Sequence, residues 1–279
     1  MNVRLDVAAG FVVVTAAAGG WAPLDAQAQQ QLGYAYTVTV TGSQAAHGSA
    51  SAPAATIPVY TGHAIALGSR GRVDIVDGGA GSLFSKGDYL LFDSAGVVIV
   101  HPATREYVRV RSDSASDPAS PLEAFGVKSV LSDETVTLDS LGPSDTVSGV
   151  PTRHYRLTVA FNLSMEGGVV RQRLATESVT DYWAAAIPDL RANALLRVNA
   201  LDAGAGGMFR ALAARVDSAA ARMRQAVALR TRTTTRVMLG PGAVVETRQT
   251  MDVSELRRTT VDESLLNIPD GYRASSPDD

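Results

Sequence analysis

Short runs in which apolar and polar residues alternate recur through most of this chain, and glycine- or aspartate-rich turns separate them. The run 34–41 (YAYTVTVT) alternates strictly and is rich in aromatic and β-branched residues, which is typical of a half-buried strand. Similar runs lie at 63–67, 72–76, 89–92, 97–100 and 106–111. The turns between them are too short for the crossover connections that parallel strands need. The pattern therefore predicts hairpins in an antiparallel meander.

The same pattern resumes after a segment rich in serine, aspartate and proline at 112–121. Further strands are predicted at 127–131, 135–138, 152–163, 169–183, 230–239 and 243–253. We expect a mainly β (α+β) fold. It would be one large curled antiparallel sheet, or incomplete β-barrel, of about 11 strands.

One stretch late in the chain has helical periodicity. Within a helical insertion at 188–227, residues 208–227 place apolar side chains on one narrow stripe at about 100° per residue. We expect this amphipathic helix to pack its stripe on the concave face of the sheet. Two interpretations stay open: ordinary core packing, or a helix that lines or covers a ligand cavity. The residues predicted for such a cavity are Phe209, Leu212, Val216, Met223, Tyr182 and Trp183.

The N-terminal residues predict export. Arg4 precedes the apolar run 7–18, and Asp25-Ala26-Gln27-Ala28 carries an A-x-A cleavage pattern. This arrangement indicates a secretory signal peptide at 1–28, although a buried N-terminal helix or strand is the alternative. The mature chain, 29–279, is then expected to be a single exported domain, periplasmic or otherwise outside the cytoplasm. It would be soluble, and not lipid-anchored because the chain has no cysteine.

Two further segments are expected to lack regular structure. The low-complexity segment 43–56 (SQAAHGSASAPAAT) predicts a flexible loop. The last residues, 274–279, predict a disordered tail.

Charge is distributed unevenly along the chain. The net charge is −3, which gives no electrostatic case for binding nucleic acid. Residues 188–250, however, carry 10 arginines against 4 acidic residues. Arg230, Arg232 and Arg236 fall on one face of a predicted strand and form a candidate basic rim. Such a face is either simply solvated or a contact for an anionic membrane surface or an acidic partner.

Motifs for catalysis and metal binding are absent from the sequence. The absence of cysteine excludes disulfides, Cys-ligated zinc and thiol catalysis. The four histidines are far apart, and no H-E-x-x-H, G-x-S-x-G or phosphate-binding glycine motif occurs. His154 is interpreted as a structural histidine with its hydrogen bonds satisfied. We therefore predict no catalytic residue, no metal site and no cofactor.

The whole arrangement resembles the LolA/LolB-like periplasmic lipoprotein carriers and their uncharacterised relatives. The resemblance rests on the signal peptide, the meander, the inserted helix and short local similarities at 87–93, 149–157, 180–183 and 265–272. It extends over about residues 32–273. It implies an incomplete antiparallel barrel with helical material in its mouth. One departure is that the helical residues of this chain lie late and in one block, and no functional residue of the family is transferred.

The leading functional prediction is a non-enzymatic, exported binding or carrier protein. Its ligand would be a lipid, an acyl chain or a lipidated protein, held in an apolar cavity between sheet and helix. One alternative is a cell-envelope scaffold or protein-interaction module with a filled core. A second is a hydrolase whose catalytic residues are scattered in the sequence. Neither the oligomeric state nor the ligand follows from the sequence.

Overall fold

A computed structural model describes residues 30–48, 59–78, 84–93, 96–111, 128–167, 170–190, 209–223 and 226–275. The predicted signal peptide lies outside these residues.

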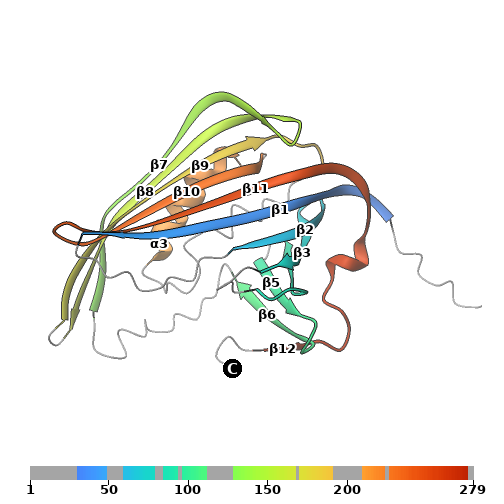
Figure 1. The fold of residues 1–279 in the computed structure, drawn as a ribbon, viewed down its shortest axis with the longest axis horizontal. Coiled ribbons are helices and arrows are strands. Elements are labelled where there is room, and N and C mark those ends of the chain that lie inside the picture. The colour runs from blue at the N-terminus through green and yellow to red at the C-terminus, as the bar shows by residue number, and fades with distance from the viewer. Residues whose placement is uncertain are drawn as a thin grey trace, which may run out of the picture.

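The described residues form one sheet of twelve strands in the order β12-β6-β5-β4-β3-β2-β1-β11-β10-β9-β8-β7. The strands are β1 (Gln30–His47), β2 (Tyr60–Leu67), β3 (Arg70–Asp77), β4 (Tyr89–Asp93), β5 (Gly96–His101), β6 (Glu106–Arg111), β7 (Lys128–Val147), β8 (Val150–Gly167), β9 (Val170–Ala185), β10 (Val227–Gly240), β11 (Ala243–Asp262) and β12 (Arg273–Ala274). Neighbouring strands are antiparallel except for the short parallel pair β12–β6. The sheet curls into an arch that is not closed (Figure 1).

The connectivity explains why the arch resembles an opened barrel. Strands that are consecutive in sequence pair with one another within two groups, β1 to β6 and β7 to β11. β1 joins the two groups because it pairs with β2 on one side and with β11 on the other. Pairing of β6 with β7 would close the ring. Instead β6 pairs with β12, and β7 is an edge strand. The predicted fold class is confirmed, including the approximate number of strands.

Alternation along the strands produces the buried concave face. In β2, for example, Tyr60, Ala64 and Ala66 are buried while His63 is exposed. Gly71 in β3 is needed for this packing, because a Cβ atom there would lie 2.2 Å from the Phe92 ring. The sheet can therefore bring an aromatic ring directly against the backbone of the neighbouring strand.

The helix lies on the concave side of the arch. α3 (Arg210–Ala220) continues into the 3₁₀ turn η2 (Ala221–Met223) and packs against the sheet (Figure 1). Leu212 and Met223 are buried in the main core, and the Phe209 ring packs edge-to-face on Phe161 of β8 at 5.5 Å. The predicted helix is confirmed from 209 to 223. Val227, placed at its end by the sequence pattern, instead begins β10.

A second, smaller apolar cluster lies on the outer face of β4, β5 and β6. Tyr89, Leu91, Val98 and Val100 are buried there under the C-terminal segment, defined as residues 263–275. This segment begins with the 3₁₀ turn η3 (Glu263–Leu266) and contributes Ile268 and Tyr272 to the cluster, together with Tyr107 of β6. The motif at 265–272 therefore serves to cover the outer face of the sheet.

The boundaries of several elements differ from the sequence predictions. The loop expected at 43–56 is wrong at its start, because residues 43–47 continue β1 and pair with 244–248 of the long strand β11. The strands expected at 127–131 and 135–138 are one strand, β7, which continues through a bulge between Ser132 and Thr135. The tail expected at 274–279 is wrong at its start, since Ala274 pairs with Tyr107; residues 276–279 lie outside the described residues.

Candidate ligand groove between the helix and the sheet edge

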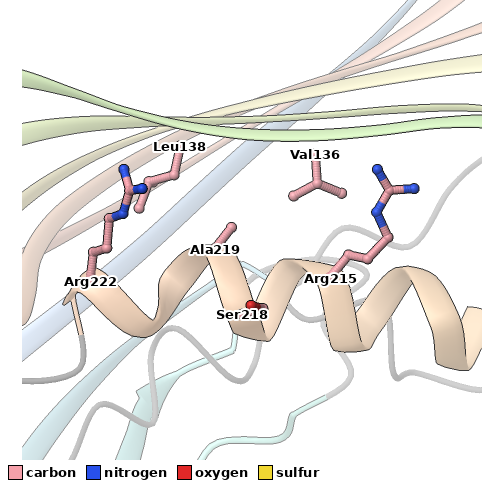
Figure 2. Close-up of a pocket in the computed structure, with 6 residues that line it drawn as sticks. All are labelled: Val136, Leu138, Arg215, Ser218, Ala219 and Arg222. Atoms are coloured by element: carbon pink, nitrogen blue, oxygen red, sulfur yellow. The ribbon is translucent and has the colours of Figure 1, made fainter.

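A groove separates α3 and η2 from the edge strand β7. Its volume is about 390 Å³, and Figure 2 shows side chains from both walls pointing into it. Val136 and Leu138 come from β7, and Arg215, Ser218, Ala219 and Arg222 come from the helix and its 3₁₀ extension.

Simple periodicity places these residues together. Val136 and Leu138 are two residues apart on a strand, so both face the concave side. Residues 215, 218, 219 and 222 follow the i, i+3, i+4, i+7 spacing of one helix face. This face lies beside the apolar stripe that holds the helix on the core. The groove is therefore the flank of a well-packed helix.

The groove combines apolar walls with positive charge. Val136, Leu138 and Ala219 form the apolar part (Figure 2). Arg215 Nη1 donates a 3.0 Å hydrogen bond to the main-chain oxygen of Glu134 and lies 3.5 Å from that residue's Oε2. No carboxylate among the residues that the structure describes forms an ion pair with Arg222.

The six residues predicted to line a cavity lie elsewhere. Leu212 is 0% and Met223 1% exposed, so both are packed on all sides. Phe209 and Val216 are partly buried against the same core. None of the six lines the groove.

Tyr182 and Trp183 are neighbours in β9 and project to opposite faces of the sheet. Tyr182 is buried among the residues of the main core. Burial raises its pKa to about 12. Its phenol is therefore neutral at physiological pH, as expected for a core residue.

Trp183 belongs to the convex face, where it organises a cluster of polar side chains. The His154 ring stacks on its indole at 4.7 Å, and its Nε1 donates to Ser144 Oγ at 3.2 Å. His154 Nε2 also forms a 2.7 Å hydrogen bond with Asp181 Oδ1. His154 thus has the structural partners that the sequence analysis expected of it.

The three arginines of the candidate basic rim do share the convex face of β10. Arg230 Nε donates to Asp252 at 2.5 Å, and Arg236 Nε donates to Glu246 at 2.8 Å. The guanidinium of Arg232 lies 5.2 Å from the centre of the Trp183 indole. Two of the three charges are therefore compensated across the strand pair β10–β11, which makes this face much less basic than its sequence suggests.

A smaller pocket of about 180 Å³ lies beneath the C-terminal segment. Arg70 borders it and anchors that segment through hydrogen bonds to Glu263, the main-chain oxygen of Leu266 and Asn267. We interpret this pocket as a packing gap under the C-terminal segment.

Neither a metal site nor a membrane-spanning helix is found among the described residues. No group of three or more His, Asp or Glu side chains in them is placed to hold a metal ion. No helix in them has the length and apolar character needed to cross a bilayer.

Comparison with known proteins adds little to this geometry. No protein-family model and no curated protein matches the chain. Among solved structures, an uncharacterized conserved protein from Thermus thermophilus is similar over 87% of this chain and 89% of its own. The sequences are 12% identical and the TM-score is 0.33, which is too low to support an argument about function.

The sequence analysis missed the groove because it followed the most apolar face of the helix. Arg215 and Arg222 were placed outside that stripe, and no role was assigned to Val136 or Leu138. A search for a second helix face, with the spacing i, i+3, i+4, i+7, would have identified the helix residues that line the groove. The strand side of the groove depends on which strand lies at the edge of the sheet, and strand order cannot be predicted from a local sequence pattern.

Proposed function

We propose that this protein is an exported, non-enzymatic carrier or binding protein for a lipid acyl chain, of the LolA/LolB-like kind. The groove between α3 and β7 is its binding site in this proposal. The observation that carries the proposal is a groove of about 390 Å³ with apolar side chains on both walls. Ligand pockets of proteins span about 300–1,000 Å³ and are lined mainly by apolar groups with a few placed polar ones.

The position of the groove supports this proposal. A helix packed inside an unclosed arch leaves its flank open toward the edge strand, and an alkyl chain fits against such a flank without disturbing the core. Val136 and Leu138 lie on one side of that chain and Ala219 on the other (Figure 2). Burial of apolar surface on both sides supplies the driving force for binding.

The test is to fill the groove. Ala219→Trp introduces an indole between the helix and β7, and we expect it to weaken binding of a fluorescent fatty-acid probe roughly tenfold or more, as steric exclusion from a site requires. Asp217→Trp is the control, because Asp217 is exposed and is not three or four positions from any residue that lines the groove. Binding is measured by fluorescence titration of the full chain.

Two results would count against the proposal. Unmodified protein that binds no fatty-acid probe would exclude the carrier function. Equal loss of binding in both tryptophan variants, or in neither, would place the site outside the groove.

A further inference from the structure

The two arginines that flank the groove differ in how their charges are compensated. Arg215 is engaged by the main-chain oxygen and the carboxylate of Glu134, at 3.0 and 3.5 Å. Arg222 is exposed and has no acidic partner among the residues that the structure describes. The groove therefore has a neutralised end and a positive end.

The apolar part of the groove lies between these two ends. Arg215 and Arg222 are seven positions apart, which corresponds to roughly 10 Å along a helix axis. Both side chains extend toward β7, and Leu138 lies near Arg222 while Val136 lies near Arg215 (Figure 2). A chain lying on Val136, Ala219 and Leu138 would thus have one end beside each arginine.

We propose that the ligand is an anionic single-chain amphiphile, with its carboxylate at Arg222 and its alkyl chain directed toward Arg215. This inference rests on the proposed function. A neutral headgroup forms no ion pair with the Arg222 guanidinium, so it gains no charge-assisted hydrogen bond there. A carboxylate would form such bonds, and the planar guanidinium matches its geometry. A cationic headgroup is disfavoured at this end of the groove.

The test compares three probes that share one chain and differ in headgroup charge: dodecanoate, 1-dodecanol and dodecyltrimethylammonium. Affinities are measured by titration calorimetry on the full chain, below the concentrations at which the probes form micelles. We expect dodecanoate to bind a few-fold more tightly than 1-dodecanol, as an exposed ion pair implies, and the cation to bind least. Because Arg222 is exposed, the preference for dodecanoate should weaken as salt is added.

Substitution then locates the headgroup. Arg222→Gln should reduce dodecanoate affinity to that of 1-dodecanol and leave 1-dodecanol binding unchanged. The convex-face variant Arg232→Gln is the control and should keep the preference for dodecanoate, whereas Arg215→Gln tests the opposite orientation of the ligand. A merely structural role of Arg222 would lower the affinities of both probes together.

The outcomes separate this inference from the proposed function. If no probe binds, the carrier function itself is excluded. If dodecanoate and 1-dodecanol bind equally and Arg222→Gln changes neither, the acyl-chain site stands and the anionic headgroup is wrong. If Arg215→Gln alone abolishes the preference, the orientation of the ligand is opposite to the one proposed.

Discussion

At the scale of single residues, the convex face of the sheet shows how a charged strand is stabilised without a partner molecule. Asp181 accepts hydrogen bonds from Arg156 at 2.9 and 3.1 Å and from His154 at 2.7 Å. His154 is held in turn by stacking on Trp183. The carboxylate is therefore satisfied from two directions, and its contribution to stability depends on its charge.

This arrangement predicts a pH dependence. Burial raises the pKa of Asp181, but the hydrogen bonds from Arg156 and His154 outweigh it and hold the pKa below its ordinary value. A lowered carboxyl pKa stabilises the fold above the unfolded-state value, about 3.9, and the stabilisation is lost as the pH falls through the folded-state pKa. Asp181→Asn should cost about 1–3 kcal/mol at pH 7, since it removes charge-assisted bonds, and less near pH 3.

Urea unfolding of both proteins at the two pH values measures this difference. Asp270→Asn, at an exposed position, is the control and should change stability little at either pH. A cost of Asp181→Asn that is the same at pH 3 as at pH 7 would contradict the electrostatic explanation.

A second prediction at this scale concerns Leu212, which is fully buried and does not line the groove. Leu212→Ala should lower the free energy of unfolding by about 2–5 kcal/mol, the usual cost of a cavity in a dense core. The folded variant should bind the fatty-acid probe as the unmodified protein does. Leu265→Ala, which truncates a side chain that is 46% exposed, is the control.

If Leu212→Ala costs much less than this range and also alters probe binding, we would conclude that Leu212 lines a ligand cavity. Denaturant titration and probe fluorescence on the same samples distinguish the two cases.

At the scale of elements, the C-terminal segment and the helix protect opposite faces of the sheet. α3 covers part of the concave face, whereas residues 263–275 cover the outer face of β4, β5 and β6. The C-terminal segment is fixed at its start by Arg70, and β12 fixes its end against β6. The short strands of the sheet therefore have apolar cover on both faces.

At this scale we predict that removing one contact of the C-terminal segment lowers the local stability of β4, β5 and β6 and of no other strand. Tyr272→Ala should cost about 1–3 kcal/mol and speed hydrogen exchange in β4–β6, with β8–β10 unchanged, because local stability follows local packing. Tyr272→Phe keeps the ring and should exchange as the unmodified protein does. Uniform acceleration over all strands would show instead that the sheet unfolds as one cooperative unit.

Most elements were predictable from sequence because their signals are local. Period-2 runs such as 34–41 and the helical spacing of 208–227 depend only on neighbouring residues, and both indicated the correct element type. The extension of β1 through residues 43–47 was not predictable in this way, because those small residues are strand only through pairing with β11. The bulge between Ser132 and Thr135 was not predictable either, and the sequence pattern was interpreted as two separate strands there. The φ of 55° at Asp133 occurs in turns as well as in bulges.

At the scale of the whole molecule, the candidate site depends on a relation that no local pattern contains. The helix residues 215–222 and the strand residues 136–138 are distant in sequence and meet because β7 ends the sheet beside α3. Strand order is set by long-range pairing. Sequence reasoning therefore predicted the architecture and the helix, but none of the residues that it named for a cavity lines the groove.

The free edge has a mechanical consequence. β7 forms one wall of the groove, and within the described part of the chain its strand ladder is shared with β8 alone. Arg215 of α3 adds one side-chain hydrogen bond, to the main-chain oxygen of Glu134. In a closed barrel, displacing any strand would break ladders on both of its sides. Here the wall is held by a single ladder, so we expect β7 to move outward with its bonds to β8 kept and with only the Arg215–Glu134 contact to α3 broken. We therefore expect the groove to widen on its β7 side when a larger ligand binds, while the helix stays packed on the core.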